Sequence, residues 1–225
     1  MKKQNRLFPL AGSCGVILLS TLAVQADEPG WYLKADAGGT ITSDTELKEF
    51  FGQTVAPGAK VKFDPGMRIG FAGGYQFTDW FGLEAETGVI ANKIKSIDGA
   101  TRVDDASLAN VPLLFNVRFQ GPRDSVVSPY VGAGVGTSIS VLDMDEVQYG
   151  AATVRGNQSD AVFAYQAFGG LRFKLNDHMG ISVEYRYFAT KDPQWEDNDF
   201  GPSSGKVAFG DAETHSVSVS FEYKF

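Results

Sequence analysis

Few residues in this chain have the types and spacing that catalysis requires. The sequence contains two histidines, and His178 follows an Asn-Asp pair that is typical of a solvated turn. His215 precedes Ser216, and Glu213 and Glu184 are possible acidic partners for a Ser–His–carboxylate hydrolase. Adjacent residues of a strand point to opposite faces, however, so His215 and Ser216 are poorly placed to share a proton. We therefore predict no catalytic residues and no enzyme activity.

Two acidic clusters could in principle bind calcium through carboxylate oxygens. The first contains Asp143, Asp145 and Glu146, and the second contains Asp192, Glu196, Asp197 and Asp199. Neither cluster has the spacing of an EF-hand loop. Solvated acidic loops are the simpler interpretation, so we predict no metal site and no cofactor.

The first 26 residues have the organisation of a secretory signal peptide. A positive start is followed by the apolar or small run 10–24, and small residues then precede a cleavage point before Asp27. The apolar run is too short for a spanning helix, and no later run approaches the roughly 20 residues that such a helix needs. We predict a cleaved signal at 1–26 and one domain at 27–225.

Cleavage would remove three positive charges and no negative ones, so the formal net charge would change from −7 to −10. Such an acidic chain is a poor partner for nucleic acid. The only cysteine, Cys14, would leave with the signal, so the mature chain could form no disulfide. The segment 11–14 loosely resembles a lipoprotein cleavage box, but it precedes most of the apolar run.

Alternating apolar and polar residues predict eight strands. They lie at 31–40, 67–77, 81–92, 107–120, 130–141, 160–175, 179–189 and 216–225. The connections 41–66, 93–106, 142–159 and 190–213 are long, whereas 78–80, 121–129 and 176–178 are shorter. Short turns on one side and long loops on the other are expected of an up-and-down barrel in the bacterial outer membrane.

The polarity of the two strand faces favours a membrane barrel over a soluble lipocalin. One face carries apolar residues, and the other collects twelve charged ones: Lys34, Asp36, Arg68, Glu84, Glu86, Arg118, Arg172, Lys174, Glu184, Arg186, Glu222 and Lys224. Only a protein surrounded by hydrocarbon gains from turning its charges inward. Aromatic residues at the strand ends, with Tyr130 among them, suggest an interfacial girdle. The fold class is therefore all-β, an eight-stranded antiparallel up-and-down transmembrane β-barrel.

An eight-stranded barrel leaves room inside only for side chains or one small ligand. We expect the seven positive and five negative lumen residues to pair and fill the interior rather than line a pore. The inward residues Gly70, Gly132, Gly134 and Gly136 would make room for Arg118 and Arg172. Pro112 lies within a strand, where it removes a ladder hydrogen bond, so we expect a bulge or bend there.

Three segments resemble the outer-membrane β-barrel family that includes opacity-type surface antigens, and the small barrels OmpA and OmpX share its architecture. The segments are 111–115, 129–136 and 184–187. This resemblance implies export through the periplasm to the outer membrane, with outer-membrane lipid and lipopolysaccharide as neighbours. Phe221, Tyr223 and Phe225 resemble the aromatic-ended signal that the barrel-assembly machinery takes up. Proline is also common in the family at the position of Pro112.

The function predicted from these features is a non-enzymatic, structural or surface-interaction role carried by four exposed loops of a monomer. Two alternatives stay open: a narrow channel for small solutes and, from the His215–Ser216 pair, a lipid-modifying enzyme such as a lipid A deacylase. The acidic loops could also bind lipopolysaccharide weakly through bridging divalent ions.

Cell fractionation combined with gel electrophoresis tests both the fold class and the location. The protein should partition with the outer membrane, and unboiled samples should migrate differently from boiled ones because a folded barrel resists SDS. Identical mobility, or recovery in the soluble fraction, would contradict both predictions.

Overall fold

The computed structural model describes residues 29–225 apart from 123–124, 151 and 197–204, so the predicted signal at 1–26 lies outside the described residues. The described chain contains no helix that is long and apolar enough to cross a membrane. It folds into the strands β1 (Gly30–Thr42), β2 (Thr45–Phe50), β3 (Lys60–Phe63), β4 (Gly66–Gln76), β5 (Phe81–Ile97), β6 (Ala100–Gln120), β7 (Val127–Tyr149), β8 (Ala152–Lys174), β9 (Met179–Thr190), β10 (Gln194–Glu196), β11 (Lys206–Phe209) and β12 (Ala212–Lys224).

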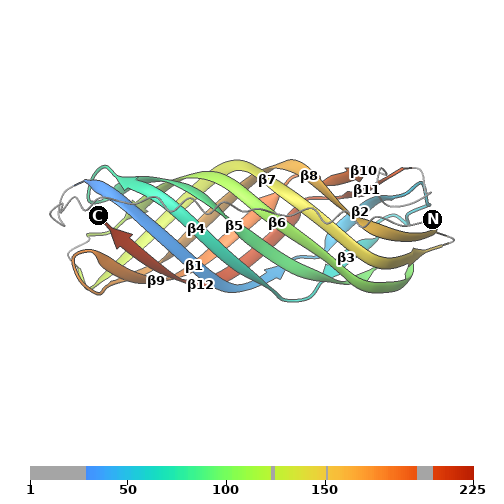
Figure 1. The fold of residues 1–225 in the computed structure, drawn as a ribbon, viewed down its shortest axis with the longest axis horizontal. Helices are drawn as coiled ribbons and strands as arrows, with labels where there is room; N and C mark the ends of the chain where they lie inside the picture. The colour runs from blue at the N-terminus through green and yellow to red at the C-terminus, as the bar shows by residue number, and fades with distance from the viewer. Residues whose placement is uncertain (1–28, 123–124, 151, 197–204) are drawn as a thin grey trace, which may run out of the picture.

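Eight strands close into an antiparallel ring in the order β1, β4, β5, β6, β7, β8, β9, β12 and back to β1 (Figure 1). The stagger of the barrel is found by following paired residues from strand to strand. Starting at Lys34 on β1, the pairs pass once around the ring and end at Ala212 on β12. The β12–β1 register places Ala212 opposite position 44, ten residues beyond Lys34. This stagger tilts the strands, and a barrel of this size has an interior that side chains fill. The predicted eight-stranded barrel is confirmed.

The two faces of the wall have the predicted polarity. Phe115 and Phe221 point outward and are 75% and 45% exposed, whereas Arg118 and Glu184 point inward and are 0% and 1% exposed. A soluble protein of this topology would have the opposite arrangement. The exposed apolar surface is therefore the lipid-facing surface of a transmembrane barrel.

Two hairpins are much longer than predicted. β5 and β6 run to a turn at residues 98–99, and β7 and β8 stay paired as far as Tyr149 and Ala152. The predicted long loops at 93–106 and 142–159 are therefore wrong. Along β5 the apolar residues change face, because Lys93 and Lys95 point outward while Ile94 points inward. In the sequence, this reversal looks like the end of a strand with an outward apolar face. In the structure, the same strand continues beyond the membrane into water.

The other two predicted long loops also contain strands. β3 pairs with β5, β2 with β3, β11 with β2, and β10 with β11, so two short hairpins extend the wall at the end away from the C-terminus (Figure 1). This extramembrane wall encloses an apolar core formed by Leu47, Phe50, Phe51, Ala59, Val61, Ile94, Ile97, Ala106, Leu108, Leu142, Met144, Val147, Tyr149, Val154, Trp195, Val207 and Phe209. Above the membrane the barrel thus has the polarity of a soluble protein.

Pro112 causes a gap in the ladder but no bulge. The β5–β6 pairing passes from Thr87 opposite Leu113 to Ile90 opposite Asn110 without a change of register. Proline has no N–H group, so pairing is lost locally on this side of β6, while Val111, Pro112 and Leu113 stay paired with β7. The pairing thus shows no bulge at Pro112, and the local bend that was the other expectation stays a prediction.

Aromatic side chains gather at the short-turn end, as predicted. Trp31 contacts Tyr75 with ring centroids 5.1 Å apart, and Trp80 stacks on Phe119 at 6.0 Å. Tyr130 is an exception, because it points into the barrel and is buried. Its assignment to the girdle was therefore wrong, because Tyr130 lies two residues before the inward Gly132 and shares its face.

Trp195 should be the main residue that holds the extramembrane wall together. It is buried, its Nε1 donates to the Ser140 carbonyl at 2.9 Å, and its ring packs edge-on against Phe209 at 5.0 Å. Trp195→Ala should destabilise this wall by about 3–5 kcal/mol through the cavity it leaves. Limited proteolysis of the full chain in lipid vesicles should then cut the wall faster, while the folded gel mobility is retained.

The matched control is Trp80→Ala, because Trp80 is exposed at the other end of the barrel. This variant should leave the cleavage rate of the extramembrane wall unchanged. Equal cleavage of wild-type and Trp195→Ala protein would contradict the role given to Trp195.

Candidate functional site in the charged lumen

The structure places eleven of the twelve predicted lumen residues inside the barrel, each no more than 5% exposed. They are Lys34, Asp36, Arg68, Glu84, Glu86, Arg118, Arg172, Glu184, Arg186, Glu222 and Lys224. Lys174 lies at the short-turn end, half-buried, with Nζ 2.9 Å from Asp177. The Lys174 ammonium holds the pKa of the Asp177 carboxyl below its ordinary value. The lumen is therefore densely charged in the half of the barrel nearer the short turns.

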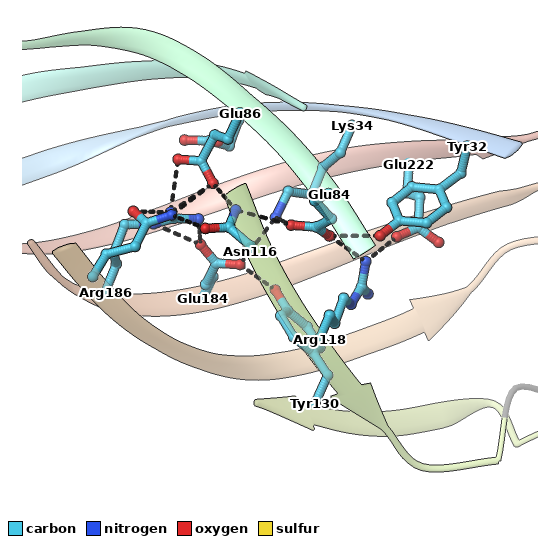
Figure 2. A network of polar contacts seen from close by, with 12 residues as sticks. Tyr32, Lys34, Glu84, Glu86, Asn116, Arg118, Tyr130, Glu184, Arg186 and Glu222 are labelled. Carbon is cyan, nitrogen blue, oxygen red and sulfur yellow. Dashed lines mark hydrogen bonds and ion pairs between the residues drawn. The ribbon is translucent and has the colours of Figure 1, made fainter. Parts of the chain in front are cut away.

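The upper part of the charged cluster is organised around two carboxylates. Arg186 donates to Glu86 at 2.7 Å and to Glu184 at 2.5 Å (Figure 2). Arg68 donates to the same Glu86 at 2.6 Å and to Asp36 at 2.8 Å. Glu86 is therefore shared between two arginines that come from β9 and β4.

The lower part continues the same pattern of shared charges. Lys34 Nζ lies 3.3 Å from Glu184 and 3.9 Å from Glu84. Arg118 Nη1 lies 3.2 Å from Glu84 and 2.6 Å from Glu222 (Figure 2). Each charge in this region thus has neighbours of the opposite sign on different strands.

Together these ion pairs connect ten residues into one chain in which the sign alternates at every step. Arg172 ends it, with Nε 3.0 Å from Glu222. The order is Asp36, Arg68, Glu86, Arg186, Glu184, Lys34, Glu84, Arg118, Glu222 and Arg172. Five acids balance five bases, so the chain carries no formal net charge. Buried ions are tolerated only when they are paired in this way.

Neutral polar side chains complete the network and were not predicted. Tyr32 donates to Glu84 at 2.8 Å and Tyr130 donates to Glu184 at 2.9 Å. Tyr130 lies on β7, the one ring strand that contributes no member of the ion-pair chain, so all eight ring strands are connected. Strand parity could have identified Tyr32, because it is two residues from Lys34 and must share its face.

Aromatic rings pack against the guanidinium groups of two buried arginines, in addition to their hydrogen bonds. Arg118 Nε and Nη2 have no hydrogen-bond acceptor among the described residues, but the guanidinium lies 4.4 Å from the Tyr130 centroid and 5.6 Å from that of Tyr32. Arg186 likewise lies 4.7 Å from the Phe168 ring. Such cation–π contacts stabilise a desolvated guanidinium.

The inward glycines lie close to other residues, but not to the predicted ones: the atoms nearest a Cβ at Gly70, Gly132, Gly134 or Gly136 belong to neither Arg118 nor Arg172. A Cβ at Gly132 would overlap the Phe168 ring, and one at Gly70 would overlap Asp36. Arg172 lies instead against Gly180, where a Cβ would be 2.7 Å from its Nε. Glycines do make room for larger side chains, but which side chain occupies the space depends on the order of the strands around the ring.

Two further layers of side chains fill the lumen between the ion-pair chain and the extramembrane wall. Ile90, Leu114, Ala164 and Phe188 form a small buried apolar cluster. Above it lies a belt of hydroxyl and amide groups that pair across strands, in Thr42–Thr214 at 2.9 Å, Thr40–Asn92 at 3.2 Å and Ser140–Asn110 at 2.6 Å. This belt separates the charged lumen from the apolar core of the extramembrane wall.

The residues considered for hydrolysis do not assemble. His215 points outward, and its Nδ1 lies 2.7 Å from the Tyr185 hydroxyl, whereas Ser216 is buried in the lumen. Glu184 is occupied by the ion-pair chain. His178 lies beside the C-terminal strand, with Nδ1 3.1 Å from the Lys224 carbonyl.

In the part of the chain that the structure describes, no group of three or more histidine, cysteine or acidic residues is placed so that it could hold a metal ion. Asp143, Asp145 and Glu146 lie on β7 rather than in a loop, and Glu146 pairs with Arg102 and Arg155. Residues 197 and 199 of the second cluster lie outside the described residues.

The residues of the proposed assembly signal lie on the last strand and at its end. Phe221 points to the lipid side, and the rings of Tyr223 and Phe225 are 5.2 Å apart. The Phe225 N–H donates to the Trp31 carbonyl at 3.0 Å, which ties the chain end to β1. Recognition of this segment by the assembly machinery stays a prediction.

The fold and the lumen together define a transmembrane β-barrel of the outer-membrane class. The model of the outer membrane protein beta-barrel domain family matches residues 11–225, and the chain belongs to that family. It is therefore an outer-membrane protein.

Solved structures with a similar fold cover most of the chain. Neisserial surface protein A is 15% identical with a TM-score of 0.52, over 87% of this chain and 97% of its own. Outer membrane protein OprG from Pseudomonas aeruginosa is 17% identical with a TM-score of 0.59, over 90% and 99%. Outer membrane protein AlkL is 17% identical with a TM-score of 0.52, over 99% and 97%. At these identities the similarity concerns the fold alone. No curated protein matches the sequence.

Removing one member of the ion-pair chain should be costly. Arg186→Met leaves the carboxylates of Glu86 and Glu184 with fewer partners in a buried site, so we expect the free energy of unfolding to fall by about 3–5 kcal/mol. Urea unfolding of the protein in lipid vesicles, followed by the gel-mobility shift, measures this change.

Lys174→Met is the matched control, because the Lys174–Asp177 pair is partly exposed at the rim. It should lower the free energy of unfolding by less than about 1 kcal/mol. Equal losses for the two variants would mean that the ion-pair chain contributes no special stability.

Proposed function

We propose that the protein is a non-enzymatic outer-membrane barrel with a closed lumen, whose structural or surface-interaction role is carried by its extramembrane wall. The observation that supports this proposal is the alternating chain of ten buried ions, which links seven ring strands across the lumen. A lumen occupied by side chains that hold one another has no continuous water path.

A narrow channel is the main alternative, and the ion-pair chain argues against it. Water and solutes could pass only if several pairs opened together, and breaking one buried pair by removing a partner costs about 3–5 kcal/mol. The apolar cluster of Ile90, Leu114, Ala164 and Phe188 lies above the ions, and the apolar core of the extramembrane wall lies above that. An ion crossing the lumen would have to lose its hydration at each apolar layer.

The extramembrane wall supports a surface-interaction role in a form different from the four exposed loops that the sequence predicts. Its outer side is polar and includes Asp143 and Asp145, while its inner side is packed. A preformed β-surface loses little conformational entropy when a partner binds, so it can present a fixed pattern of side chains. We therefore assign the role to the wall built by the β2–β3, β5–β6, β7–β8 and β10–β11 segments.

The placement of His215 and Ser216 supports the non-enzymatic part of the proposal. Their side chains lie on opposite sides of the wall, so a proton cannot pass between them. A lipid A deacylation by wild-type protein that is lost in His215→Ala or Ser216→Ala would overturn this part.

Planar-bilayer recording tests the closed lumen. Wild-type protein, with folding checked by gel mobility, should insert without producing discrete conductance steps. Arg186→Ala combined with Phe188→Ala removes a charged and an apolar obstruction, and we expect it to raise the frequency of openings. Phe115→Ala is the control, since Phe115 faces lipid and should leave the record unchanged. Reproducible steps from the wild-type protein would favour the channel.

A further inference from the structure

The lipid-facing apolar band of the barrel is not level around the ring. On β6 the outward residues stay apolar from Phe119 through Leu113 to Ala109, and the first polar one is Ser107, twelve residues from Phe119. On β12 they are apolar from Phe221 to Val217, and His215 follows only eight residues from Tyr223. Tyr223 and Phe119 both lie at the short-turn end. β6 and β12 lie on opposite sides of the ring, four strands apart.

The difference corresponds to a substantial depth. Four residues span roughly 13 Å along a strand, which is about 10 Å of membrane depth at a tilt of about 40°. This is a large fraction of an apolar band that is typically about 25 Å tall. The outward face of β12 therefore becomes polar at a level where that of β6 is still apolar, although Ile41 on the neighbouring β1 is exposed opposite His215.

A connected group of polar aromatic side chains occupies this level on β8, β9 and β12. The Tyr185 hydroxyl lies 2.7 Å from His215 Nδ1. The Tyr187 ring lies 5.5 Å from the His215 ring and 6.1 Å from the Tyr165 ring. Glu213 is the next outward residue above His215. We call Tyr165, Tyr185, Tyr187, His215 and Glu213 the polar notch.

Hydrocarbon is a poor environment for these groups. Three phenol hydroxyls, an imidazole and a carboxylate need hydrogen-bond partners, and each unsatisfied group in a bilayer core costs several kcal/mol. Side chains of this amphipathic type are typical of the membrane–water interface. A bilayer also adapts to a shorter apolar band by thinning at modest cost.

From this we infer that the polar notch is a docking surface for lipid headgroups: the headgroup layer and its water descend along the β9–β12 side, and the bilayer is thinner there than beside β6. The partner is the bilayer surface itself, and hydrogen bonds from the headgroup layer satisfy the Tyr, His and Glu side chains. The inference does not depend on whether the lumen conducts.

Spin labels at two matched positions test this directly. Val217 and Leu113 are each six residues from the short-turn aromatic of their strand, and they are 59% and 53% exposed. The labels are attached to Val217→Cys and Leu113→Cys in the full chain with Cys14 replaced by serine, in phosphatidylcholine vesicles. The ratio of collisions with a water-soluble nickel chelate to collisions with oxygen should be several-fold higher at 217 than at 113.

Two other outcomes would overturn the inference. Equal, low access of the nickel chelate at both positions would mean that the notch satisfies itself within hydrocarbon. Low access of both reagents at 217 alone would mean that a second copy of the chain covers this side.

A second comparison assigns the effect to the notch. Adding Tyr185→Phe and His215→Leu to the 217-labelled chain should lower its ratio toward that of position 113, because the two notch residues nearest position 217 then become apolar. A ratio that does not fall, in a variant with the folded gel mobility, would mean that other residues draw the headgroups inward. If this variant does not fold, the comparison of 217 with 113 still decides the inference.

Discussion

Hydrocarbon can neither accept a hydrogen bond nor solvate an ion, and the structure of this barrel follows from that constraint. A sheet edge cannot face lipid, so the eight ring strands close on themselves with a stagger of ten residues. Charged side chains on those strands must then point inward, where other charged and polar side chains are their partners. The alternating chain from Asp36 to Arg172 is the arrangement that gives each ion a neighbour of opposite sign.

The same strands obey the opposite rule once they leave the membrane. On β5 the outward residue changes from Ala91 to Lys93, while the inward residue changes from Asn92 to Ile94. The hydrogen-bonded wall continues, but its solvent has changed from lipid to water, so its polarity reverses. The belt of threonine, serine and asparagine pairs lies between the two regimes, where neither ions nor a large apolar core is present.

These two regimes connect the fold with the proposed role. The lower part is an anchor whose paired ions fill the lumen, and the upper part is a packed wall that presents polar side chains to water beyond the membrane. The transition between them lies at different depths around the ring, because His215 and Tyr187 interrupt the apolar surface on one side. The surface of the barrel thus also determines how the surrounding bilayer is shaped.

The sequence by itself determined what depends on strand parity. Alternation identified the eight crossing strands, and it assigned Arg118, Glu184 and Arg186 to the interior, because successive side chains of a strand always point to opposite faces. It could not follow strands whose apolar face switched, as at Ile94. It also could not choose partners: Arg186 pairs with Glu86, 100 residues away, and Tyr130 joins them from β7. Those choices were decided only by the tertiary structure, since ring order and stagger set which inward side chains meet.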